Sequence, residues 1–134
     1  MKLFKVSFLF ALLVAVSLPV VAQAQLQVNI PFNFTVAGKP LPAGQYRVAR
    51  VFEMDQAVWR VSNWKGAAAI ILTNAVESAG RAHPPSMVFL AAGRTYSLVE
   101  FWPKAHIGRE LLLKPKVKTT ILAEGAKYVE IGAE

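Results

Sequence analysis

The side chains that could support catalysis or metal binding are few in this sequence. The two histidines are His83 and His106, Ser86 lies close after His83, and Glu100 and Glu110 follow further along the chain. A metal site needs His, Cys or carboxylate ligands at close spacing. There is no cysteine, and the histidines fall in two separate loops, where we expect them to be exposed. The sequence therefore predicts no metal site and no cofactor.

Glu100 and Glu110 are the best pair for acid–base chemistry. Glycoside hydrolysis uses two carboxyl groups about 5–9.5 Å apart, and Glu100 lies in an aromatic segment with the pattern of a strand. The alternative is that Glu100 faces solvent and pairs with Arg94 or Arg109, and this alternative is favoured. The two glutamates are thus weak catalytic candidates, and an enzyme is the less favoured interpretation.

A nucleophilic serine would need a neighbouring base and a sharp turn. Ser86 follows Pro85 and lies near His83, but no G-x-S-x-G motif surrounds it and no third group orients the histidine. The sequence also lacks a Gly-rich phosphate loop. These absences favour a role without catalysis.

Trp64 is the candidate for ligand binding. It lies within Asn63-Trp64-Lys65-Gly66, which is typical of a turn, whereas Trp59 and Trp102 fall in expected strands and are predicted to be buried. A tryptophan at a hairpin tip offers a flat apolar face and a polar N–H, and can stack on a sugar or a peptide.

The N-terminus has the pattern of a helical secretory signal peptide. Lys2 and Lys5 precede a short apolar run, and Ala22-Gln23-Ala24 provides small residues at the two cleavage positions. A membrane anchor would need about 20 apolar residues, and this run is shorter. The sequence predicts cleavage after Ala24 and an exported domain, periplasmic or extracellular, with no membrane span after the leader.

Removal of residues 1–24 would leave residues 25–134 as one domain. The chain has a formal net charge of +7, and loss of Lys2 and Lys5 with the leader would leave +5. Such a charge favours anionic envelope polymers or lipid head groups, although a solvated charge excess without a partner is the favoured interpretation. No basic helix or aromatic-basic motif accompanies this charge, so nucleic acid is not an expected partner. Without cysteine, the domain must be stabilised by packing and strand pairing rather than by disulfides.

Residues 28–36 alternate between apolar and polar, which predicts one half-buried strand. Its inward side chains would be Val28, Ile30, Phe32, Phe34 and Val36. Pro31 cannot donate to a neighbouring strand, which suggests an edge position or a bulge. Residues 37–44 are rich in Pro and Gly and are predicted to form a loop over a buried Leu41.

Further short strands are expected downstream. They begin at Tyr46 and then cover Ala57–Ser62, Ala67–Thr73, Met87–Ala91, Thr95–Trp102, Arg109–Leu113, Val117–Leu122 and Lys127–Ile131. In Ala67–Thr73 the side chains that would face either side of a strand are mostly apolar, which predicts a strand covered on both sides. Residues 74–85 are predicted to form a long loop. Seven to nine short strands indicate an all-β antiparallel sandwich or small barrel.

Four segments carry a family resemblance: IPFNFTVAGKPLPAGQYRV, AAAIILTNAVE, MVFLAAGRTYSLVEFW and GREL. Their order resembles a family of small exported bacterial proteins of uncharacterised function, with the pattern PF-[DN]-F-x-V-x-x-K-x-LPAG-x-Y-x-V followed by a VLT strand, an aromatic hairpin and GREL. The match covers most of residues 28–113. It implies a secreted β domain and carries over no catalytic residue. Asn33 stands where an acidic residue is usual, and Trp64 where the turn is usually acidic and Gly-rich.

These observations predict a non-enzymatic binding or structural module of the bacterial envelope or exterior. Its expected partner is an envelope polysaccharide or another envelope protein. Two alternatives stay open: a hydrolase of an envelope polymer that uses Glu100 and Glu110, and a small barrel that carries an apolar ligand.

Overall fold

The computed structural model describes residues 26–113 and 125–134 and contains no helix in these ranges. The strands are β1 (Leu26–Ile30), β2 (Phe34–Val36), β3 (Lys39–Leu41), β4 (Gly44–Arg50), β5 (Val58–Asn63), β6 (Ala68–Glu77), β7 (Ser86–Ala92), β8 (Thr95–Trp102), β9 (Ile107–Leu111) and β10 (Lys127–Gly132). No helix long and apolar enough to cross a membrane occurs in these ranges. The predicted signal peptide, with Ala22 and Ala24, and the predicted strand Val117–Leu122 lie outside them.

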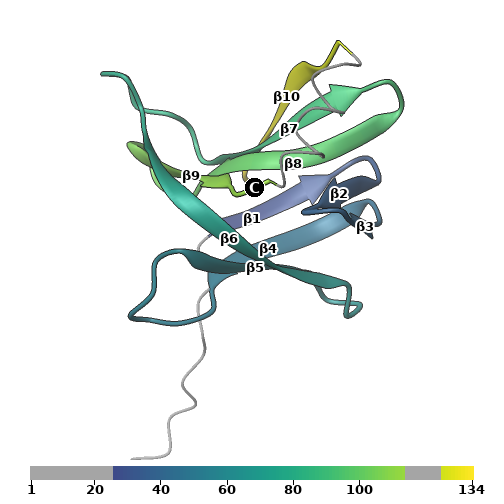
Figure 1. Cartoon of the computed structure of the whole chain (residues 1–134), viewed down its shortest axis with the longest axis horizontal. Coiled ribbons are helices and arrows are strands. Elements are labelled where there is room, and N and C mark those ends of the chain that lie inside the picture. The colour runs from purple at the N-terminus through teal and green to yellow at the C-terminus, as the bar shows by residue number, and fades with distance from the viewer. Residues whose placement is uncertain (1–25, 114–124) are drawn as a thin grey trace, which may run out of the picture.

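The ten strands belong to one hydrogen-bonded sheet that is folded into two layers (Figure 1). The first layer has the order β1-β4-β5-β6, and the second consists of β9, β8, β7 and β10, with the β2–β3 hairpin attached to β8. β6 belongs to both layers, because its first half pairs with β5 and its second half, Thr73–Glu77, pairs with β9. All pairs are antiparallel except β2–β8. The predicted all-β fold is confirmed.

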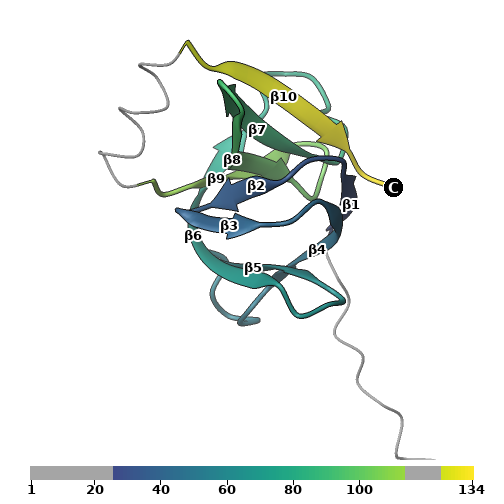
Figure 2. The ribbon, with the colours of Figure 1, turned by 90° about the vertical axis from the view of Figure 1, so that its right-hand side faces the viewer.

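The sheet stays open, although its two ends approach each other (Figure 2). β10 leads back towards β1, where the Glu134 amide donates to Gln27 O at 3.1 Å. Gln45 Nε2 donates to Glu134 Oε2 at 2.5 Å. β1 and β10 do not pair as strands, so of the two predicted architectures the structure forms the sandwich.

The predicted strand over residues 28–36 is divided in two, which is a correction. β1 pairs with β4, whereas β2 pairs with β3 and β8, so the chain crosses from one layer to the other at residues 31–33. Pro31 has no N–H to continue a ladder, which explains why the strand ends there. The predicted inward parity is nevertheless kept, and only Phe32 is half-buried, stacked on Tyr96 with ring centroids 3.8 Å apart.

Residues 37–44 were expected to form a loop, but they include strand β3. Ala37 and Gly38 have positive φ angles of 50° and 83° and form the two-residue turn of the β2–β3 hairpin. β3 is the outermost strand, a position that tolerates Pro40. The burial of Leu41 is confirmed. The division of residues 28–36 and this added strand raise the number above the seven to nine predicted.

The prediction that Ala67–Thr73 is covered on both sides is wrong. Ile71 and Thr73 are buried, but Ile70 and Leu72 are 66% and 56% exposed on the outer face. Arg60, which lies opposite Ile70 on β5, is exposed as well. The strand also extends to Glu77, because its second half gains β9 as a partner, so the predicted loop 74–85 is reduced to residues 78–85.

Both layers contribute to one core. Trp59 of the first layer meets Phe101 of the second with ring centroids 5.0 Å apart, and Phe34 meets Tyr46 at the same distance. Trp59 is buried as predicted. Each fully buried large apolar side chain contributes about 1.5–3 kcal/mol, so these contacts make up much of the stability.

Candidate functional site

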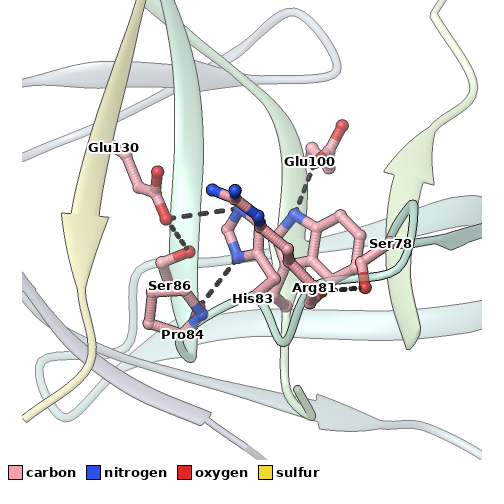
Figure 3. Close-up of polar contacts among 8 residues, drawn as sticks. Ser78, Arg81, His83, Pro84, Ser86, Glu100 and Glu130 are labelled. Carbon is pink, nitrogen blue, oxygen red and sulfur yellow. Dashed lines mark hydrogen bonds and ion pairs between the residues drawn. The ribbon is translucent and has the colours of Figure 1, made fainter. Parts of the chain in front are cut away.

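His83 lies on the outer face of the second layer and is half-buried (Figure 3). Its ring stacks on Trp102, with centroids 4.2 Å apart and planes 14° apart. Nδ1 donates to Pro84 O at 2.9 Å, and Nε2 lies 3.5 Å from Glu130 Oε1. His83 is therefore not the exposed loop histidine that we expected, whereas His106 is exposed. Trp102 is buried, as predicted, but beneath this loop rather than between the layers.

Ser86 and His83 contact the same carboxylate oxygen rather than each other. The Ser86 hydroxyl is buried and donates to Glu130 Oε1 at 2.8 Å. A nucleophilic serine must be exposed to its substrate. Its hydroxyl must also donate to a base that can accept the proton during attack. Ser86 instead links the start of β7 to β10. No three His, Asp or Glu side chains among the described residues could hold a metal ion together.

Glu100 and Glu110 are brought together by the register of β8 and β9, where they lie directly opposite. Such residues share a face and have Cβ atoms about 4.5–5.5 Å apart. Glu100 Oε1 accepts a hydrogen bond from Trp102 Nε1 at 2.5 Å. The expected ion pairs of Glu100 with Arg94 or Arg109 are not observed in the described part of the chain. The strand register thus places the two glutamates side by side.

Trp64 lies at the tip of the β5–β6 hairpin and is 81% exposed. The turn is fixed by Asn63, whose Oδ1 accepts from the Lys65 amide at 3.1 Å and the Ala67 amide at 2.8 Å. Lys65 Nζ lies 5.3 Å from the centre of the Trp64 ring. The ring is available for stacking, with one cation beside it.

A cavity of about 180 Å³ opens between the two layers. It is lined from the first layer by Arg50 and Trp59, and from the second by Lys104 and Arg109. Sequence reasoning considered Arg109 only as a partner of Glu100 and missed this cavity. The parity of β9 was the available signal, because Leu111 is an inward residue and Arg109 must share its face.

Arg109 is only 8% exposed. Its Nε donates to Thr73 Oγ1 at 3.0 Å and its Nη2 to Thr73 O at 3.3 Å. No described carboxylate lies within ion-pair distance of it. Burial lowers the pKa of the guanidinium and the negative charge of Asp55 raises it, but an arginine remains charged in proteins. The structure therefore buries a charge that no described side chain neutralises by direct contact.

The residues of the family-like motif have structural roles. Asn33 Oδ1 accepts from the Ala43 amide at 2.9 Å, and Tyr46 OH donates to Pro42 O at 2.6 Å. These bonds fix the LPAG turn, and an aspartate at position 33 would supply the same acceptor. A second cavity of about 370 Å³ lies beside this hairpin, with Arg94 as its one charged lining residue.

Gly108 of the GREL segment also has a structural role. A Cβ atom placed on it would lie 2.6 Å from Cδ2 of Trp102, so only glycine fits against the ring.

Comparison of the chain with protein-family models, with curated proteins and with solved structures found no match.

Proposed function

We propose that the chain is a non-enzymatic binding module of the bacterial envelope or exterior, exported by its N-terminal leader. The observation that carries this proposal is the cavity between the layers, whose wall contains the buried and unneutralised charge of Arg109. Ligand sites in proteins are typically concave and combine apolar walls with a few placed polar or charged groups. Removal of the leader takes away Lys2 and Lys5, and the remaining net charge of +5 favours an acidic envelope polysaccharide as the partner.

The candidate catalytic side chains Ser86 and Glu100 already make hydrogen bonds to other side chains of the protein. The Ser86 hydroxyl is buried against Glu130, and the Glu100 carboxylate accepts from Trp102. A hydrolase that uses Glu100 and Glu110 is the second candidate, because the strand register does place these residues opposite each other. An apolar ligand is disfavoured for the cavity between the layers, because cations line it, and for the core, because aromatic side chains fill it.

The experiment that tests this function compares binding with hydrolysis. The purified protein is mixed with insoluble acidic polysaccharide prepared from bacterial envelopes, and both the retained protein and the newly formed reducing ends are measured. We expect retention without reducing ends. Release of reducing ends by the wild type, abolished in Glu100→Gln and Glu110→Gln, would instead identify a hydrolase.

The variant Trp64→Ala separates two binding surfaces. If the polysaccharide stacks on Trp64, this variant loses retention, and if it binds at the cavity, retention is unchanged. Because Trp64 is exposed, the substitution removes no buried contact and the variant should fold.

A further inference from the structure

We infer that the cavity between the layers binds a single oxyanion group, a carboxylate or a phosphate, through the guanidinium of Arg109. This inference rests on the proposed binding function and deepens it by naming the chemistry of the ligand. Arg50 and Lys104 line the same cavity and add two positive charges to its mouth.

The guanidinium is fixed in position, and some of its N–H groups have no hydrogen-bond partner among the described residues. An arginine side chain has five N–H donors, and the two contacts to Thr73 use one at Nε and one at Nη2. Every buried side-chain nitrogen or oxygen of the described residues has a hydrogen-bond partner. The Nη1 group has no hydrogen-bond partner among them, and because Arg109 lines the cavity, we place this group at the cavity surface. Its planar edge matches the two oxygens of a carboxylate or phosphate.

A purely structural role does not account for Arg109. Thr73 does not depend on the arginine to satisfy its hydroxyl, because Thr73 Oγ1 already donates to Ala57 O at 2.9 Å. A leucine or methionine would fill the same space without burying a charge. Burial of a charge is unfavourable unless the charge is paired. The nearby Asp55 is not in ion-pair contact with Arg109, and its Oδ1 accepts the Ala57 amide at 2.9 Å.

The size and remaining walls of the cavity limit the ligand. A volume of about 180 Å³ is below the range of about 300–1,000 Å³ for sites that enclose drug-sized ligands. It can hold one anionic group with a few attached atoms, such as an acidic substituent or chain end. Trp59 Nε1 donates to Gln56 O at 2.8 Å, so Trp59 offers its ring rather than its N–H. Ile107 adds further apolar surface for the attached carbon atoms.

The test is a titration of the ¹⁵N-labelled protein, followed by NMR, with phenyl phosphate, benzoate and benzyl alcohol. We expect at least one of the two anions to shift the Nε–H signals of Arg109 and Trp59 saturably, with weaker binding at higher salt. The preferred anion distinguishes a phosphate-bearing from a carboxylate-bearing ligand. Benzyl alcohol has the same ring without the charge and should produce no saturable shift.

Two matched variants distinguish anion binding at the cavity from a general effect of the positive net charge. Arg50→Gln and Arg47→Gln lie on the same strand and remove the same charge, but Arg50 lines the cavity and Arg47 lies exposed on the opposite face. We expect Arg50→Gln to weaken anion binding several-fold and Arg47→Gln to leave it unchanged. Arg109→Met should weaken it by about tenfold or more, and Lys104→Gln replaces this variant if it does not fold.

Two results would overturn the anion site: no saturable shift with either anion at millimolar concentration, or equal weakening by Arg47→Gln and Arg50→Gln. Retention on the envelope polysaccharide distinguishes this failure from that of the proposed function. If retention persists while the cavity binds no anion, the binding module stands and its site lies elsewhere. If retention is also absent, the proposed function fails with it.

Discussion

The imidazole of His83 covers the indole of Trp102 in a parallel stack, with ring centroids 4.2 Å apart. The same imidazole lies 3.5 Å from Glu130 Oε1 of β10. One side chain in the 78–85 loop thus joins two strands of the second layer and shields a tryptophan on its outer face.

Replacement of His83 should separate the stacking on Trp102 from the contact with Glu130. We expect His83→Ala to lower the free energy of unfolding by about 0.5–1.5 kcal/mol, the range for an aromatic pair, and to expose Trp102 to quenching by acrylamide. His83→Phe keeps the stack and should lose less. If the two variants are equally unstable in denaturant unfolding, the contact with Glu130 is the more important one.

Substitution of Gly108 should be strongly destabilising. The added methyl of Gly108→Ala would meet the Trp102 ring at 2.6 Å, and overpacking of this kind costs about 1–3 kcal/mol. Gly132→Ala is the control, because a Cβ there meets nothing within 4 Å. Equal unfolding midpoints for the two variants would contradict the tight contact between Gly108 and Trp102.

The turn at Ala37 offers a stabilising substitution. Ala37 has φ 50°, a left-handed conformation that is unfavourable for most L-residues, and Asn-Gly is the preferred pair in such a turn. We expect Ala37→Asn to raise the free energy of unfolding by about 0.5–1 kcal/mol. Ala79→Asn, at an exposed loop position without this backbone conformation, should have no such effect. A neutral result at both positions would mean that the hairpin relaxes around Ala37.

Tyr46 should make the protein sensitive to alkaline pH. Burial raises the pKa of its phenol, and the hydrogen bond from Asn63 partly offsets this. The unfolded chain ionises first, near its ordinary value of 10.0, so the stability contributed by Tyr46 is complete below that pH and is lost as the pH rises through the higher folded pKa.

The variant Tyr46→Phe tests this linkage. It loses the bond to Pro42 O, so we expect it to be less stable at neutral pH by about 1 kcal/mol. Its stability should decline less between pH 10 and 11 than that of the wild type, measured by denaturant unfolding. Tyr128→Phe serves as the control because Tyr128 is exposed. A decline as steep in Tyr46→Phe as in the wild type would contradict the assignment.

Local periodicity was sufficient to predict the buried face of strands β1, β4 and β5. Val28 and Ile30, Tyr46 and Val48, and Trp59 all point inward as their alternation indicates. Pairing was not predictable in the same way, because the crossing at residues 31–33 depends on partners far along the chain. The exposure of Ile70 could not be inferred either, since an apolar side chain does not reveal whether another element covers it.

The candidate sites show the same limit. His83, Trp102 and Glu130 come from three separate segments, and no local pattern links them. The opposition of Glu100 and Glu110 follows from strand register, which the turn after Pro103 determines. The burial of Arg109 was available from parity alone, but the absence of a neutralising carboxylate required the folded arrangement.

Because β6 belongs to both layers, it influences how the protein unfolds. A single continuous backbone carries hydrogen bonds to β5 on one stretch and to β9 on the next, so we expect the two layers to unfold together. Amide exchange in β5 and β9 should accordingly report one common opening event, as expected of a single cooperative unit.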